Sequence, residues 1–108
     1  MIYSIGEITA LVAPVAEKYG IRAVYLFGSY ARQEATEQSD IDFLIDTTGS
    51  QLKGLLALGA LYCELEALFQ KKIDLITVNS LEQKALMPSE ERFRDNVKRE
   101  RVMLYEVA

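Results

Sequence analysis

Hydrophobic and polar positions repeat with two different periods along the chain, and each period predicts a different kind of element. Between residues 5 and 19 apolar side chains recur at helical spacing, behind Ser4 and Glu7, which form the pattern of a capping box. Gly20 ends this predicted helix, and Pro14 predicts a kink or a break within it. The N-terminal segment is therefore expected to be a capped, amphipathic helix that is disturbed near its middle.

Three short runs have the pattern of strands. Residues 23–27 are β-branched and aromatic and stop at a glycine, which suits a buried strand that ends in a sharp turn. Residues 40–45 alternate, with Asp40, Asp42 and Leu44 on one face and only apolar side chains on the other. Residues 73–78 form the third run. Three predicted strands give one small sheet.

The segments between and after these runs favour helix. A short helix is expected from residue 29 to about residue 35, and a longer one over residues 52–69, whose apolar arc is wide enough to be covered on two sides. From residue 80 onward the chain is expected to be helical, restarting at Pro88 and running to about Tyr105. The order predicts an α/β (α+β) fold, with residues 1–108 as a single domain whose three-stranded sheet is flanked by helices.

Charge and composition narrow the function. The chain has 16 acidic and 12 basic side chains, a net charge of -4, so stable binding of a nucleic acid is not expected. The sequence shows no secretory or membrane signal, which predicts a cytoplasmic protein without a membrane partner. It also contains no histidine, and this excludes Ser-His-Asp and Cys-His catalysis. Carboxylates are left to carry the chemistry.

Asp40 and Asp42 are the first candidate pair. They lie two positions apart on a predicted strand, so their Cα atoms are about 6 to 7 Å apart and their side chains leave the same face. Two carboxylates on one face of a strand repel each other unless a cation lies between them. Mg²⁺, which prefers oxygen ligands, is the expected cation.

Asp74 repeats the anomaly inside the third apolar run. If the second and third strands are neighbours, Asp74 joins Asp40 and Asp42 on one surface. Three such carboxylates suit a phosphoryl or nucleotidyl transfer with two metal ions, because one ion activates the attacking hydroxyl and the other stabilises the leaving oxygens. Asp74 is expected on the side of the nucleophile, where it also accepts the proton.

The dipeptide Gly28-Ser29 supplies the second half of the predicted site. A glycine between a strand and a helix lets the backbone approach a phosphate, and the Ser29 hydroxyl binds its oxygens. Arg32, one turn further on, reaches the same anion. The segment lacks the Gly-Lys-Ser/Thr ending of a P-loop, which excludes a Walker-type NTPase.

The two halves together resemble a known signature. Gly28-Ser29, ten residues and then Asp40-Ile41-Asp42, within LFGSYARQEATEQSDIDFLID, is similar to the motif of the DNA polymerase beta-like nucleotidyltransferases, in particular the minimal nucleotidyltransferase (MNT) branch. The resemblance implies a mixed sheet flanked by helices, two Mg²⁺ ions at Asp40, Asp42 and Asp74, and ATP bound by Gly28 and Ser29. The sequence departs from this pattern at Gln33, where a glycine is frequent, and at Glu37, where a proline is frequent.

MNT proteins of this size are similar to antitoxins that are encoded beside HEPN-type ribonuclease toxins. This resemblance implies transfer of AMP from ATP to a tyrosine hydroxyl of the toxin, with release of pyrophosphate, in a homo- or hetero-oligomer. Two other functions stay open. One is a non-catalytic antitoxin that occludes its partner through the apolar helix of residues 52–69. The other is a small-molecule nucleotidyltransferase, although 108 residues leave little room for an acceptor pocket.

Overall fold

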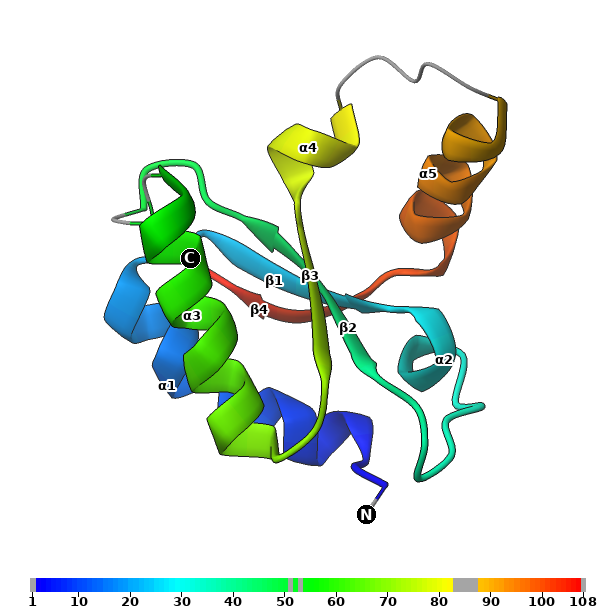
Figure 1. Ribbon diagram of the computed structural model, residues 1–108, viewed down its shortest axis with the longest axis horizontal. Coiled ribbons are helices and arrows are strands. Elements are labelled where there is room, and N and C mark those ends of the chain that lie inside the picture. Colours follow the sequence, from blue (N-terminus) through cyan, green and yellow to red (C-terminus); the bar gives the residue numbers. More distant parts are fainter. Residues whose placement is uncertain (1, 51, 53, 83–87, 108) are drawn as a thin grey trace.

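The computed structural model describes residues 2–50, 52, 54–82 and 88–107. Its elements are α1 (Ile5–Tyr19), β1 (Ala23–Phe27), α2 (Gly28–Ala31), β2 (Ile41–Asp46), α3 (Gly54–Phe69), β3 (Ile73–Thr77), α4 (Val78–Glu82), α5 (Pro88–Glu100) and β4 (Val102–Glu106) (Figure 1). They confirm the predicted α/β class. Nothing in the described part of the chain is a helix long and apolar enough to cross a membrane.

The strands form one mixed sheet in the order β3-β2-β1-β4. β1 pairs antiparallel with β2 and with β4, and β2 pairs parallel with β3. The parallel pair requires a crossover, which α3 supplies. The predicted adjacency of the second and third strands is therefore confirmed, and with it the premise on which the role of Asp74 depended.

The predicted strand count of three is wrong, because the C-terminal segment is not helical up to Tyr105. α5 ends at Glu100, and Val102–Glu106 forms the fourth strand beside β1. The free edge of β1 decides this outcome, since a strand partner satisfies its backbone N–H and C=O groups and buries Leu104. A five-residue run cannot be assigned from its own pattern when its partner lies near the other end of the chain.

α1 confirms the predicted capping and corrects the predicted break. The Ser4 side chain accepts a hydrogen bond from the Glu7 backbone N–H (3.0 Å), and the Glu7 carboxylate accepts one from the Ser4 backbone N–H (2.9 Å). Gly20 ends the helix in the left-handed conformation. The helix nevertheless continues through Pro14. Pro14 lies on the exposed side of α1, where water can satisfy the carbonyl that its missing N–H leaves unpaired.

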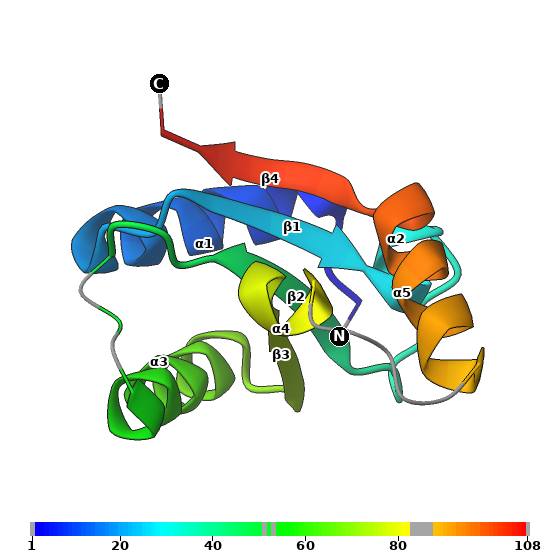
Figure 2. The same ribbon diagram turned by 90° about the horizontal axis from the view of Figure 1, so that it is seen from above.

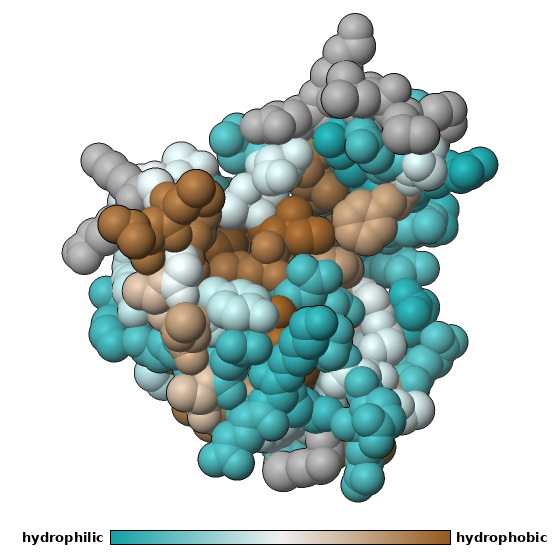
Figure 3. Space-filling view, viewed as in Figure 1, coloured by the Kyte–Doolittle hydropathy of each residue, from teal (hydrophilic) through white to brown (hydrophobic). Residues whose placement is uncertain are grey.

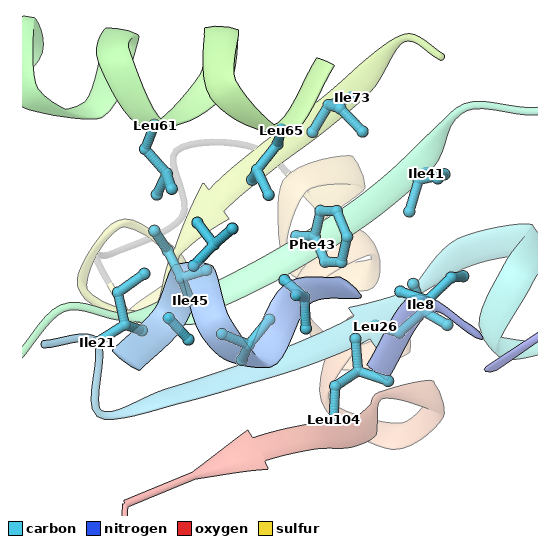
Figure 4. Close-up of a cluster of buried hydrophobic side chains, with 14 of the residues drawn as sticks. Ile8, Ile21, Leu26, Ile41, Phe43, Ile45, Leu61, Leu65, Ile73 and Leu104 are labelled. Atoms are coloured by element: carbon cyan, nitrogen blue, oxygen red, sulfur yellow. The ribbon is translucent and has the colours of Figure 1, made fainter. Parts of the chain in front are cut away.

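The larger hydrophobic core lies between the sheet and the helices α1 and α3 (Figure 4). The apolar face of β2 points into it, and Phe43 there packs against Phe69 of α3 with ring centroids 5.8 Å apart. α3 buries only one stripe, Leu61, Leu65 and Phe69, while Leu55 and Leu56 are 87% and 93% exposed. The expectation that this helix is covered on two sides is therefore wrong for the described chain.

The helices α4 and α5 lie on the opposite side of the sheet from α1 (Figure 2). There Leu81 of α4 and Val97 of α5 form a smaller cluster with Phe27 and Leu44 of the sheet. Asp42 shares this face with Leu44, because side chains two apart along β2 point the same way. The acidic side chains therefore emerge beside the short helices rather than in the main core. This arrangement leaves them accessible.

Candidate active site

Asp42 and Asp74 are brought together by the parallel pairing of β2 and β3. The register places Asp42 directly opposite Asp74, so two carboxylates that lie far apart in sequence share one face. Both line a pocket of about 270 Å³. Asp42 is half-buried and Asp74 is exposed, so one is fixed by packing and the other is open to an incoming group. These two residues form the centre of the candidate site.

Asp40 lies immediately before β2 and does not line this pocket. It lines a neighbouring pocket of about 280 Å³ together with Lys71 and Lys72. In the described part of the chain, no three acidic or cysteine side chains come close enough to hold a metal ion. Asp40 contributes to the site through its charge, and the predicted ligand set of three carboxylates stays a prediction.

Gly28 has a role that the sequence pattern does not reveal. It adopts a φ of 73°, and a Cβ atom built there overlaps Asp42 Oδ2 and lies 3.1 Å from Asp42 Cγ. The absence of a side chain therefore makes room for the carboxylate of Asp42, besides allowing the turn from β1 into α2. Ser29 is half-buried in the first turn of α2 and is not among the described residues that line the pocket.

Arg32 lies in the pocket with Asp42, as expected for an anion-binding residue, but it has acidic partners there. Its Nε donates to Glu34 (3.0 Å) and its Nη1 donates to Glu100 of α5 (3.1 Å). The three side chains are partly exposed, so these ion pairs are screened and a phosphate can replace them. Arg32 thus joins α2 to α5 across the pocket.

One wall of the pocket is α5, whose residues are not part of the predicted site. Phe93, Asn96, Val97 and Glu100 line the pocket at positions i, i+3, i+4 and i+7 of this helix. Phe93 packs edge-on against Phe27, with ring centroids 6.1 Å apart. The helical spacing of these four residues was the available signal, but only the packing of α5 against the sheet makes it meaningful.

Asp46 provides an internal comparison for Asp42 because it points the same way from the same strand. Its Oδ1 accepts a hydrogen bond from the Thr48 backbone N–H (3.0 Å), and its Oδ2 lies 3.8 Å from Arg22 Nε. Both contacts are local to the end of β2, so Asp46 stabilises the turn there and takes no part in the pocket of Asp42.

Burial, together with the smaller effects of the negative charges of Asp74 and Asp40, raises the pKa of Asp42 from its ordinary value of 3.8 to about 6, although the charge of Arg32 acts in the opposite direction. The environment of Asp42 thus disfavours its negative charge. A cation at this position would remove that penalty. The donor atoms and the electrostatics of the pocket therefore fit a divalent metal ion.

This raised pKa predicts how the metal-free protein responds to pH. Since the folded state binds the proton more tightly than the unfolded state, the contribution of Asp42 to stability is fully present below about pH 3.8 and is lost as the pH rises through about 6. In a chelating buffer, Asp42→Asn should therefore become more stable relative to the wild type between pH 4 and pH 7. Urea unfolding at several pH values measures this difference, and ¹³C NMR of the carboxyl gives the pKa. An unchanged difference across this range contradicts the prediction.

Gln33 shows why glycine is frequent at its position. It has a φ of 60°, a left-handed conformation in which a side chain costs about 1–2 kcal/mol. Gln33→Gly is expected to stabilise the fold by up to about 1 kcal/mol, because relief of strain exceeds the entropic cost of glycine. Thermal unfolding of both proteins tests this. A lower melting temperature for Gln33→Gly would show that contacts of the Gln33 side chain outweigh the backbone strain.

Comparisons with known proteins identify relatives of this chain. A family model described as a nucleotidyltransferase domain matches residues 8–104. A predicted protein adenylyltransferase of Methanocaldococcus jannaschii is 41% identical over 78 residues, which are 72% of this chain and 82% of that protein. The protein adenylyltransferase MntA of Thermococcus cleftensis is 39% identical over 74 residues, which are 68% and 73% of the two chains.

A solved structure gives the same result for the fold. The crystal structure of a toxin-antitoxin complex with AMP-PNP contains a chain that superposes with a TM-score of 0.65 at 18% identity, over 97% of this chain and 75% of that chain. At this identity the likeness concerns the fold alone. The group of proteins to which the chain is related is thus given by the sequence matches, and the solved structure agrees with the fold.

Proposed function

Because the chain belongs to the nucleotidyltransferase domain family, we propose that it transfers AMP from ATP to a tyrosine hydroxyl of a HEPN-type ribonuclease toxin and thereby acts as its antitoxin. Family membership confirms the predicted enzyme class and the resemblance behind it. The observation that carries the proposal is the pairing of Asp42 with Asp74 in one pocket beside Gly28. Such a pocket suits an acid-base and metal-assisted transfer at phosphorus.

The relatives support the substrate and the acceptor. Both are named protein adenylyltransferases, a class that moves AMP onto protein side chains, and one of them is 41% identical to this chain. The toxin-antitoxin complex of similar fold was crystallised with AMP-PNP, an analogue of ATP. We infer that ATP is the donor for this chain and that a toxin protein is its acceptor.

The pocket would hold two Mg²⁺ ions. Asp42 and Asp74 would be two of the carboxylate ligands, and Asp40 would be the third carboxylate. The raised pKa of Asp42 and the oxygen donors support this assignment. When bound, the metal neutralises phosphate charge and makes the attacking hydroxyl more acidic. Asp40 must turn from its own pocket toward Asp42 to complete the set.

The residues of the chain have distinct tasks in this reaction. Gly28, Ser29 and Arg32 hold the β- and γ-phosphates at the start of α2. The tyrosine oxygen forms a bond to the α-phosphorus, the bond from that phosphorus to the bridging oxygen breaks, and pyrophosphate leaves with the electron pair. Asp74 accepts the hydroxyl proton, because it is the exposed carboxylate of the pair. We place this reaction in the cytoplasm, in a hetero-oligomer with the toxin and without nucleic acid or membrane.

Neutralisation by occlusion is the second candidate, since the exposed pair Leu55 and Leu56 offers an apolar docking surface. The two functions separate in one experiment. The chain and its HEPN partner are incubated with Mg²⁺ and with ATP labelled at the α- or at the γ-phosphate. Adenylyl transfer predicts label on the partner from the α-phosphate only, and none when its tyrosine is replaced by phenylalanine. A neutralised but unlabelled partner would overturn the proposal in favour of occlusion.

A further inference from the structure

We propose that the pocket between α4 and α5 receives the aromatic side chain of the acceptor tyrosine. The proposal rests on the proposed function and identifies a second subsite for it. The pocket measures about 380 Å³, within the range of roughly 300–1,000 Å³ that is common for ligand pockets. Its described lining residues come from β3, α4 and α5: Ile76, Ser80, Leu81, Ser89, Glu90, Phe93 and Arg94.

This pocket lies on the side of the active site from which the attacking hydroxyl has to arrive. Attacking and leaving oxygens lie roughly in line at the transferred phosphorus. Gly28 follows β1, Asp42 is on β2 and Asp74 is on β3, so these groups cross the sheet in strand order. Pyrophosphate that leaves over β1 requires an acceptor that arrives over β3. Among the described lining residues only Ile76 comes from the sheet, and it belongs to β3.

Ile76 also connects the pocket to the reacting atoms. It lies two residues after Asp74 and therefore points from the same face of β3, with Cα atoms about 6 to 7 Å apart. Phe93 lines both this pocket and the pocket of the carboxylates. A side chain held between Ile76 and Phe93 can thus place its end beside Asp74.

The chemistry of the lining suits tyrosine in particular. The floor is apolar, with Ile76, Leu81 and the ring of Phe93, which is 47% exposed and available for an aromatic contact. A tyrosine has an apolar ring and a polar hydroxyl at its end, so its ring binds such a floor while the hydroxyl stays beside the carboxylates. A serine or threonine acceptor has no aromatic ring and would leave the apolar floor of the pocket uncovered.

The surface around the pocket favours a protein rather than a nucleotide. Figure 3 looks onto the β3 edge of the sheet and shows a band of hydrophobic side chains from the first turn of α3 past α4 toward α5. Leu55 and Leu56 belong to that turn and are almost fully exposed. A polyanionic nucleotide gains nothing from such a band, whereas an acceptor protein buries it on docking.

Filling the pocket tests the proposal. Ser80→Trp places a large side chain in it, and Asn79→Trp is the matched control, because Asn79 is exposed on the same helix and is not among the described lining residues. Ser80→Trp is expected to raise the KM for the HEPN partner at least 10-fold and to change the Kd for AMP-PNP with Mg²⁺ by less than 2-fold. Asn79→Trp is expected to change neither constant by more than 2-fold.

A Kd for AMP-PNP that rises instead, with an unchanged KM for the partner, would assign the pocket to the nucleotide base and overturn the proposal. Unchanged constants would overturn it as well. N-acetyltyrosinamide, titrated into the isotopically labelled protein, provides a readout that does not depend on transfer. NMR shifts are expected at Ser80, Ser89 and Ile76 of the wild type, and those at Ser89 and Ile76 should disappear in Ser80→Trp. If these shifts occur but no AMP is transferred, the proposed function fails while the tyrosine site stands.

Discussion

Asp42→Asn is expected to reduce the rate of AMP transfer roughly 10³-fold, which corresponds to a loss of about 4 kcal/mol in stabilisation of the transition state. An amide cannot replace the charge of the carboxylate at the centre of the pocket. In the same variant the metal-free protein should become more stable, because the buried charge with its raised pKa is gone. After allowance for partial exposure, this gain is on the order of 1 kcal/mol. A quenched transfer assay and thermal unfolding in a chelating buffer measure the two effects.

The matched control is Asp46→Asn, which removes the same charge from the same face of β2. Asp46 contacts Thr48 and Arg22 rather than the pocket, so transfer should stay within about 2-fold of the wild type. Stability should fall slightly instead of rising, because a local hydrogen bond and an ion pair are weakened. Equal transfer rates in Asp42→Asn and the wild type would contradict the assignment of the active site.

Gly28→Ala is the second large expected effect. The left-handed backbone at Gly28 costs a residue with a side chain about 1–2 kcal/mol, and the added methyl group overlaps Asp42 Oδ2. The carboxylate must move, so the free energy of unfolding should fall by at least about 1–2 kcal/mol and transfer should decline strongly. Urea unfolding and the transfer assay check both parts.

Gly59→Ala separates this effect from the general consequences of replacing a glycine. Gly59 lies within α3, and a Cβ atom built there meets nothing within 4 Å. Alanine in a helix is favoured over glycine by roughly 0.5–1 kcal/mol, so this variant should be slightly more stable and fully active. If Gly28→Ala behaved in the same way, the close approach to Asp42 would have no functional role.

The sequence predicts the carboxylate pair because its signal is local. An aspartate inside an apolar strand is unusual wherever the strand lies. The sequence therefore identifies Asp42 and Asp74 as candidate site residues without any information on how their strands pair. The direction of the Asp40 side chain could not be predicted in this way. Asp40 immediately precedes β2, where strand alternation no longer fixes the side chain, and it lines a different pocket together with Lys71 and Lys72.

Other features depend on contacts between distant segments. The run Val102–Glu106 follows a helix without a glycine or proline between them, so its own pattern gives no reason to end the helix at Glu100. Only the free edge of β1 makes it a strand. The apolar arc of α3 is ambiguous for the same reason, because composition cannot show that Leu55 and Leu56 extend beyond the edge of the core.

The pairing of β1 with β4 also affects how the site forms during protein synthesis. The strand that leads into Gly28 is made early, whereas its partner Val102–Glu106 is made after the other three strands of the sheet. Until then one edge of β1 exposes unpaired backbone groups, and this early segment depends on contacts of high sequence separation, which form slowly. A nascent chain should therefore acquire the geometry of the pocket only after β4 has emerged and paired with β1. Until β4 has paired with β1, the exposed edge of β1 makes the chain vulnerable to aggregation and proteolysis.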